Sequence, residues 1–422
     1  MFHYVDQPNM MATPKVLILQ GPVGPFFKEL QRGLSAAGFA TKRVVFNAAD
    51  QLFAGAGESF RFTGSPDDWT AWLETEMRDN RPDYIVVFGA RRPVHATARK
   101  VAALFGVRVI CLEEGYLRSG FITCELGGNN DSSPLCDWKW QQDAPQNTPK
   151  PVDMPRKYGA LGIWSTIYYL VRDFRSSPDE VALFHRKHEG IGTLAVSWAA
   201  HMGSRALARL ETFTKLKRLK NELNGQYIVV TLQTPQDSQL QFAARGWSNE
   251  KLISDTLGAL KDSAAKDTIV FKLHPMDRRV GKTRRFIEET ARQLNLADRI
   301  MVLNFGAIGD VVNHASGMIV INSTSAFSAL HHHIPLLVLG DAIYRHENLV
   351  TVGTETTTIQ TFLASRKVKS VECADAFIEA VKARALLPGD FYYVKGRKVA
   401  VDAITKKLEQ DLVLSREQEE VV

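Results

Sequence analysis

The stretch Lys15-Val-Leu-Ile-Leu-Gln-Gly-Pro-Val-Gly-Pro-Phe-Phe27 decides the first unit of the fold. Its opening residues form a short apolar run that is typical of a buried strand. Residues 21–25 predict a turn, and apolar residues then recur with helical spacing at Phe27, Leu30 and Leu34. A strand, a turn and a helix in this order predict one βα unit of a parallel sheet.

The same alternation of strand and helix patterns continues to residue 112 and resumes at residue 227. Apolar runs alternate with helical patterns, which predicts right-handed crossovers and parallel sheets, and therefore an α/β protein. The other expected strands cover residues 41–46, 83–88, 107–112, 227–232, 268–273, 300–303, 317–321 and 336–339. After residue 358 we expect helix to the end of the chain, with a break at residues 387–390.

The middle of the chain breaks this rhythm. Residues 127–155 are rich in Asn, Asp, Ser, Gln and Pro, which predicts a long loop. Residues 158–174 and 195–223 have helical spacing, and the second stretch contains a basic cluster of Arg205, Arg209, Lys215, Lys217, Arg218 and Lys220. The chain thus divides into an α/β domain (14–150), a helical insertion (151–224), a second α/β domain (225–385) and a helical tail (386–422).

Composition narrows the class of protein and of partner. The 422 residues are 45% apolar and 23% charged, which is typical of a soluble globular protein of two or three domains. No membrane-spanning run and no signal pattern is visible, so we expect a cytoplasmic protein. The net charge of +6 favours an anionic partner, and no nucleic-acid-binding signature is present. The four cysteines lack CxxC spacing and are expected to be reduced thiols.

Polar residues follow several predicted strands of the second half, where ligands of open α/β sheets bind. Asp237 follows the strand at 227–232, either as a helix cap or as a carboxylate that acts as nucleophile or base. Lys272 and His274 end the next strand, either as an incidental basic pair or as ligands of a phosphate.

Asn322, Ser323 and Thr324 lie between a strand and a helix, where their side chains would cap the helix and its N-terminus would suit an anion. The same segment can serve both purposes.

In the first half, Glu113 and Glu114 end a strand. Adjacent strand residues point to opposite faces, so we expect one of the two to face a ligand and to act as an acid or base, unless both lie in a solvated loop. Gly21 and Gly24 allow close approach of a ligand, but their spacing is not that of a dinucleotide-binding motif.

Two further features have competing interpretations. Three consecutive histidines, His331 to His333, diverge around a helix and cannot share one metal, so we expect a polar helix end. The basic cluster is either a solvated helix face or a contact with an anionic membrane surface, helped by the aromatic residues Trp164, Tyr168 and Tyr169.

Six segments together resemble a known family. They are Leu19–Phe27, Phe46-Asn47, Arg92-Pro-Val-His95, Glu113-Glu-Gly-Tyr-Leu-Arg118, Lys272-Leu-His-Pro275 and Ile321-Asn-Ser-Thr324. These segments resemble capsule polysaccharide biosynthesis proteins of the KpsS/LipB type, which are bacterial β-Kdo glycosyltransferases. The resemblance extends from about Val16 to about Tyr344.

The resemblance implies a GT-B-like pair of Rossmann-type domains that face a cleft. It implies CMP-Kdo as donor, no cofactor or metal, and the glycerol of (lyso)phosphatidylglycerol as acceptor at the cytoplasmic face of the inner membrane. Carried over by position, Asp237 is the nucleophile and Glu114 the acid or base. The donor would be bound by His274, Lys272, Gln233, Asn322, Ser323, Thr324, Gly21 and Gly24.

Two other functions remain open at this point. One is a transferase that extends an existing Kdo chain. The other is a non-catalytic subunit of a capsule export assembly, whose other proteins would then be partners.

Overall fold

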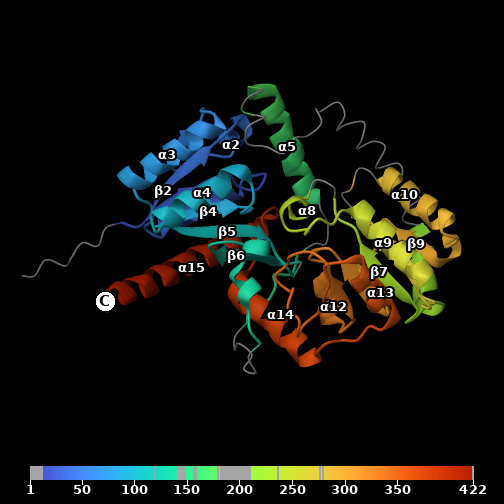
Figure 1. Cartoon of the computed structure of the whole chain (residues 1–422). Coiled ribbons are helices and arrows are strands. Elements are labelled where there is room, and N and C mark those ends of the chain that lie inside the picture. The colour runs from blue at the N-terminus through green and yellow to red at the C-terminus, as the bar shows by residue number, and fades with distance from the viewer. Residues whose placement is uncertain are drawn as a thin grey trace, which may run out of the picture. The chain divides into compact units, whose positions relative to one another are not determined.

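The computed structural model describes residues 13–117, 119–140, 148–154, 159–177, 180, 211–234, 237–274, 277 and 280–420. The chain forms two compact units, each built on its own sheet (Figure 1). Unit 1 comprises Met1–Asn129, Lys150–His188 and Leu386–Val422, and unit 2 comprises Asn130–Pro149 and Glu189–Ala385. Both sheets are Rossmann-like, so the predicted α/β fold class is confirmed.

The sheet of unit 1 has the strand order β13-β6-β5-β4-β1-β2-β3. Strands β1 to β5 are parallel, and β6 and β13 extend one edge in antiparallel fashion. The strands are β1 (Lys15–Ile18), β2 (Ala40–Val45), β3 (Glu58–Arg61), β4 (Tyr84–Phe88), β5 (Arg108–Glu114), β6 (Phe121–Leu126) and β13 (Leu386–Pro388). The sequence did not predict β3, β6 or β13.

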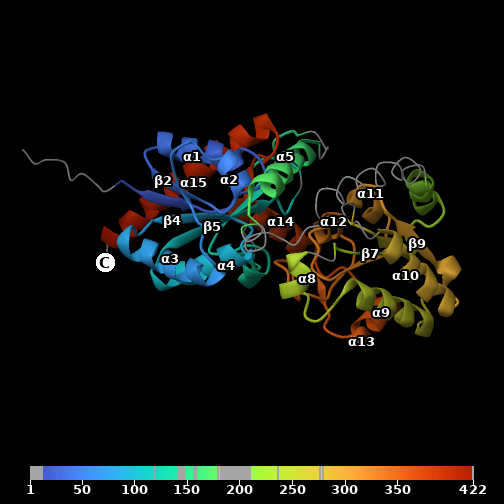
Figure 2. The same ribbon diagram turned by 90° about the horizontal axis from the view of Figure 1, so that it is seen from above.

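Helices cover both faces of this sheet. Helices α1 (Phe26–Ala36) and α15 (Val394–Glu420) lie on one side, and α3 (Pro66–Asp79) and α4 (Pro93–Leu104) lie on the other (Figure 2). Side chains of β5 alternate accordingly: Ile110 and Leu112 pack with α1 and α15, whereas Val109 and Cys111 pack with α3 and α4. Helix α2 (Ala48–Leu52) packs against α5 (Gly159–Arg175).

The structure places residues 386–422 in unit 1, whereas the sequence predicted a separate helical tail. The expected break at 387–390 contains β13, which pairs with β6. Helix α15 then contributes Ala400, Val401, Ile404 and Leu408 to the core that contains Leu30 and Leu34 of α1. Packing of α15 on the apolar face of α1 stabilises unit 1, because it removes apolar surface from water.

Unit 2 contains a parallel sheet with the order β12-β11-β10-β7-β8-β9. Helices α9 (Asn249–Asp262), α10 (Val280–Gln293) and α13 (Thr356–Ala364) share one core with it. On the other face, Tyr227 donates to the Val311 carbonyl of α11 (Ile308–Val312), and α12 (Ala326–His331) packs on β10 and α14 (Val371–Ala385). The strands are β7 (Tyr227–Thr231), β8 (Thr268–Lys272), β9 (Ile300–Leu303), β10 (Gly317–Val320), β11 (Leu336–Val338) and β12 (Thr351–Val352).

The predicted loop and insertion are divided between the units. Within the loop, η1 (Asn130–Ser132) and η2 (Pro134–Asp137) are short 3-10 turns, and Trp138 packs on Phe377 of unit 2 with ring centroids 5.1 Å apart. Helix α5 forms as predicted and belongs to unit 1, whereas residues 211–221 are helical and belong to unit 2. Residues 195–210 of the second predicted helix, with Arg205 and Arg209, lie outside the described residues.

Two smaller predictions are confirmed. His331 is the last residue of α12, His332 follows as its C-cap, and His333 has a left-handed φ of 51°, so this tract is a helix end. The four cysteines are free thiols, and burial raises the pKa of Cys111 to about 12. In the described part of the chain, none of the helices has the length and apolarity that a membrane span needs.

The role of α15 in the core of unit 1 can be tested with Ile404→Ala. Ile404 is fully buried, and we expect its truncation to lower the free energy of unfolding by about 2 to 4 kcal/mol. Val413→Ala on the same helix is the matched control, because Val413 is 55% exposed. Urea denaturation of both variants provides the comparison. Equal effects would contradict a core role for α15.

Candidate functional site

The strand order of unit 2 identifies its ligand-binding edge. From β7 the chain adds β8 and β9 on one side and then β10, β11 and β12 on the other. The switch point of the sheet therefore lies between β7 and β10, and ligands of such sheets bind at the carboxyl ends of the strands there. Gln233 and Asn322, both predicted site residues, lie just beyond these two strand ends.

Gln233 and Asn322 are polar side chains that are 5% and 6% exposed. Gln233 is held through its backbone, because Asn249 donates to its carbonyl at 2.6 Å and accepts from its N–H at 3.2 Å. Asn322 donates to the Gln239 carbonyl at 3.0 Å. Neither Gln233 Oε1 nor Asn322 Oδ1 has a hydrogen-bond partner among the described residues. Two buried acceptors at the switch point are thus suited to receive donors from a ligand or water.

Ser323 and Thr324 do not cap α12 with their side chains. The N-cap is Ser325, and no side chain caps the helix. Ser325 Oγ instead lies 2.8 Å from Ser323 Oγ and 3.2 Å from Thr231 Oγ1, and these hydroxyl contacts link the end of β7 to the turn after β10. The helix begins at Ala326, as predicted, but its N-cap is Ser325, whose backbone angles are already helical (φ −59°, ψ −19°), so the capping expectation for Asn322, Ser323 and Thr324 is wrong. The hydroxyls nevertheless lie at the switch point.

Lys272 is a buried cation at the end of β8. Its register partner is Thr231 on β7, so it stands one strand from the switch point. The ammonium donates to the carbonyls of Leu273 at 3.1 Å and Asn304 at 3.4 Å, and it forms no ion pair within the described chain. Burial lowers the pKa of Lys272 to about 8. A buried positive charge without a counter-ion is suited to bind an anion, because the anion offsets the cost of desolvation.

Asp237 is the N-cap of α8 (Ser238–Phe242), so the capping prediction is confirmed. Its Oδ1 accepts from the Gln239 N–H at 2.9 Å, and the described structure gives Oδ2 no hydrogen-bond partner. His274 is half-buried two residues after the end of β8, and its carbonyl accepts from Asp277 N–H at 3.0 Å. Pro275 lies outside the described residues. The cap engages one carboxylate oxygen, and the other has no partner among the described residues.

Unit 1 has a switch point of its own, between β1 and β4. Arg92, the N-cap residue of α4, spans it: Arg92 Nη1 donates to Gln20 Oε1 at 3.2 Å and to the Gly21 carbonyl at 3.1 Å. Close packing explains the two glycines of the turn after β1, because a side chain at either position would clash with a neighbour. A Cβ at Gly21 would lie 2.6 Å from Phe27 Cγ, and one at Gly24 would lie 2.9 Å from Trp164 Cγ.

Glu113 and Glu114 point to opposite sides of β5, as predicted. Glu114 follows the parity of Ile110 and Leu112, and its Oε1 accepts from Tyr392 OH at 3.4 Å. Burial, and then the charge of Glu114, raise the pKa of Tyr392 well above its ordinary value. Glu113 follows the parity of Cys111, and its carboxylate lies beside Gly89 in the β4–α4 turn.

His95 holds that turn from within the core. Its Nδ1 lies 2.9 Å from the Gly89 carbonyl, which can only accept, so Nδ1 carries the proton. Burial, with a smaller contribution from Arg92, lowers the pKa of His95 to about 3. The imidazole is therefore neutral at physiological pH. It keeps the turn in place without adding charge.

A network around Asp50 was missed by the sequence analysis. Asp50 is 3% exposed and accepts from Tyr168 OH at 2.8 Å and Gln20 Nε2 at 2.9 Å. Asn47 Nδ2 donates to Asp50 at 3.2 Å and to Tyr168 OH at 3.0 Å. The only indication in the sequence was the family resemblance of Phe46-Asn47 and Arg92-Pro-Val-His95, two segments to which the sequence analysis gave no role.

The aromatic residues that could have contacted a membrane pack within unit 1 instead. Tyr168 is buried, and the Trp164 indole donates to the Tyr392 carbonyl at 3.2 Å. The exposed apolar side chains of α5 are instead Ile163, Leu170 and Phe174. In the described part of the basic cluster, Lys215 is paired with Glu211 at 2.6 Å, whereas Lys217, Arg218 and Lys220 are exposed.

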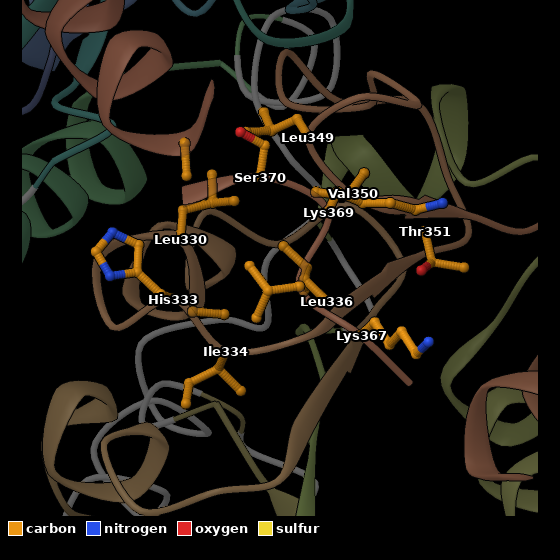
Figure 3. Close-up of a pocket in the computed structure, with 13 residues that line it drawn as sticks. Leu330, His333, Ile334, Leu336, Leu349, Val350, Thr351, Lys367, Lys369 and Ser370 are labelled. Atoms are coloured by element: carbon orange, nitrogen blue, oxygen red, sulfur yellow. The ribbon is translucent and has the colours of Figure 1, made fainter. Parts of the chain in front are cut away.

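A separate small pocket lies elsewhere in unit 2 (Figure 3). Leu330, His333, Lys367 and Ser370 are among its lining residues. Leu336, which also lines it, is the first residue of β11, so the pocket lies at the amino edge of the sheet, opposite the switch point. It contains none of the predicted site residues.

Comparison with known proteins identifies the family. Residues 83–392 match the family described as capsule polysaccharide biosynthesis protein. The chain is 30% identical to the capsule polysaccharide export protein KpsS of Escherichia coli over 350 residues, which cover 82% of this chain and 89% of that protein. It is also 30% identical to the capsule polysaccharide modification protein LipB of Neisseria meningitidis serogroup A, with 79% and 82% covered. The chain therefore belongs to the capsule polysaccharide biosynthesis protein family.

Among solved structures, the chain is similar to the β-Kdo 2,7 transferase of Thermosulfurimonas dismutans KpsC. The TM-score is 0.42 and the identity 13%, with 93% of this chain and 99% of that chain covered.

The low pKa of His95 predicts a pH-dependent loss of stability. Its folded pKa lies below the ordinary value of 6.5, so below pH 6.5 the unfolded chain binds more protons than the folded chain. Between pH 7 and pH 5 we expect His95 to lower the free energy of unfolding by about 2 kcal/mol. Denaturant titrations of the wild type and His95→Gln at both pH values measure this difference. His331→Gln, at an exposed histidine, is the control and should leave the slope unchanged.

Proposed function

We propose that this protein is a retaining β-Kdo glycosyltransferase. It transfers Kdo from CMP-Kdo to (lyso)phosphatidylglycerol and so starts the poly-Kdo linker of a capsular polysaccharide. The observation that carries the proposal is the switch point of unit 2, where, among the described residues, buried Lys272 has no counter-ion and two buried amide oxygens have no donors. Membership in a capsule biosynthesis family supplies the substrate class.

The donor's phosphate is assigned to the cations and hydroxyls of this edge. Lys272 acts as a point charge, and His274, Ser323 and Thr324 act as hydrogen-bond donors. The buried oxygens of Gln233 and Asn322 accept from hydroxyl or amino groups of the donor. Stabilising the phosphate makes CMP a good leaving group without a metal ion.

The reaction proceeds by two displacements. Asp237 Oδ2 attacks the anomeric carbon of Kdo, the bond to the phosphate oxygen breaks, and CMP leaves. The glycerol hydroxyl then attacks the same carbon, its proton passes to Glu114, and the bond to Asp237 breaks. Two inversions retain the configuration, as in retaining glycosidases. The cap on Oδ1 orients the Asp237 carboxylate for the first step.

We also propose contact with the cytoplasmic face of the inner membrane, because the acceptor is a lipid. Ile163, Leu170 and Phe174 recur on one side of α5 with helical spacing, and they are the exposed apolar residues of that helix. The exposed basic residues Lys217, Arg218 and Lys220 of unit 2 would add attraction to anionic lipids.

The function is tested by incubating the protein with CMP-Kdo and fluorescent phosphatidylglycerol in vesicles. A lipid that carries a single Kdo supports the proposal. Elongation only of a Kdo-primed lipid would instead indicate a chain-extending transferase. Absence of CMP release would indicate a non-catalytic subunit of an export assembly.

The nucleophile is tested by comparing Asp237→Asn with Asp237→Ala. The amide oxygen of Asp237→Asn can still cap α8 but cannot form the glycosyl bond, so we expect transfer to fall by a factor on the order of 1,000 or more. CMP affinity should remain within about threefold of wild type in Asp237→Asn, because capping by Asn is equivalent. Transfer at a near wild-type rate in either variant would refute the assignment.

Lys272 predicts the pH dependence of CMP binding. Its pKa of about 8 means that the ammonium is charged below pH 8 and loses its proton above it. CMP affinity should therefore fall as the pH rises from 7 to 9.5, a range in which the phosphate itself is already fully ionised. Calorimetry on Lys272→Gln should show roughly tenfold weaker binding at pH 7 and no such pH dependence. The exposed Lys261→Gln should behave as wild type.

A further inference from the structure

We propose that Arg92 binds the phosphate of the acceptor at the switch point of unit 1, and that Gln20 and Asp50 are positioning residues that orient its guanidinium. This inference rests on the proposed function for the identity of the acceptor. It adds a second anion site, on the sheet that does not bind the donor. The ligand of this site would present a phosphate oxyanion next to a hydroxyl group.

Arg92 stands where its unit would bind a ligand. It follows β4, reaches across to the turn after β1 and contacts Gln20 and Gly21 there, so it spans the switch point. Arg92 is also the N-cap residue of α4, a helix of 12 residues. No side chain caps the N-terminus of this helix, and a helix N-terminus favours negative charge. Its guanidinium lies over the Phe88 ring, 5.2 Å from the ring centroid. A planar cation fixed in this way suits an oxyanion.

The orientation of Arg92 depends on which way the Gln20 amide points. Gln20 is 2% exposed, and both ends of its amide are engaged. Its Oε1 accepts from Arg92 and its Nε2 donates to Asp50 Oδ2 at 2.9 Å. A flipped amide would present an N–H₂ group to Arg92 Nη1, and two donors cannot bond to each other.

Asp50 fixes that amide because it can only accept. Its two oxygens also receive Tyr168 OH, the Phe46 N–H at 3.2 Å and Asn47 Nδ2, so neither oxygen can turn away. Buried Arg43 lies close enough for the two charges to interact. Asp50 therefore acts on Arg92 through Gln20 and does not itself reach a ligand.

The neighbourhood of Arg92 indicates the chemical class of the ligand. A Cβ at Gly89 would lie 3.3 Å from Glu113 Oε2 and 3.5 Å from Arg92 Nε, so a carboxylate and a guanidinium flank this glycine. Gly89 also has a φ of 81°, which favours glycine. A carboxylate accepts from a hydroxyl and a guanidinium donates to a phosphate, and glycerol phosphate presents both groups together.

Substitutions at positions 50 and 20, alone and together, test the positioning role. Asp50→Ala removes the oxygen that receives Gln20 Nε2, so nothing fixes which end of the Gln20 amide faces Arg92. Gln20→Glu places two carboxylates side by side. The double variant Gln20→Glu/Asp50→Ala keeps one carboxylate, and either of its oxygens can accept from Arg92.

The measurement is calorimetric titration of glycerol phosphate into the full chain saturated with CMP. We expect each single variant, and Arg92→Ala, to weaken glycerol phosphate binding by about tenfold, the scale of one charge-assisted hydrogen bond. The double variant should return to within about threefold of wild type, because Arg92 again has an acceptor at position 20. CMP affinity should be unchanged throughout, since unit 2 binds the donor.

Three outcomes would overturn the inference. One is glycerol phosphate binding that does not change in Asp50→Ala or Arg92→Ala. Another is a double variant as weak as the single variants although its melting temperature matches wild type. The third is that Arg92→Ala weakens binding of free Kdo, which has a carboxylate, but does not weaken binding of glycerol phosphate. If glycerol phosphate depends on Arg92 but no Kdo is transferred, the site stands and the proposed function fails.

Discussion

The right-handed crossover between parallel strands is the constraint on which both candidate sites depend. In each unit the chain lays down its first strand, adds two strands on one side and then continues on the other. The first strand therefore lies beside a strand that comes much later in the unit. Helices that leave these two neighbours depart to opposite faces, which opens the carboxyl edge between them. Gln20 and Gln233 occupy this place in the two units because each follows a first strand.

The two units fill this edge in different ways. In unit 1 a guanidinium spans it and is oriented through Gln20 by the buried carboxylate of Asp50. In unit 2 the buried cation is Lys272, whose partners in the described chain are carbonyl groups. Among the described residues no carboxylate pairs with Lys272, so a bound anion would supply the negative charge that this ammonium lacks there.

The sequence predicted most of the parallel strands and the helices between them, because their apolar periodicity is local. It missed the edge strands β3, β12 and β13 and also β6; of these, β13 pairs only with β6, which lies about 260 residues earlier in the chain. Helix α15 was expected as a helix, yet its packing on α1 is a long-range contact that no local pattern encodes.

The candidate site divides in the same way. Strand ends are visible in the sequence, so Gln233, Lys272 and Asn322 were predicted and lie at the expected edge. Asp50 was not predicted, because its importance arises from Gln20, Asn47 and Tyr168, which meet only in the folded unit. The cap formed by Asp237 was predictable because it is a contact between residues two apart.

The placement of α15 has a consequence for synthesis on the ribosome. Unit 2 ends at residue 385, so all of its strands are made before the last helix of unit 1 emerges. Unit 1 begins first but is completed last, and until then the apolar side of α1 has no cover from α15. Vectorial synthesis should thus complete the second unit ahead of the first. A nascent chain released a few dozen residues early would carry a complete unit 2 and a unit 1 that still lacks its last helix.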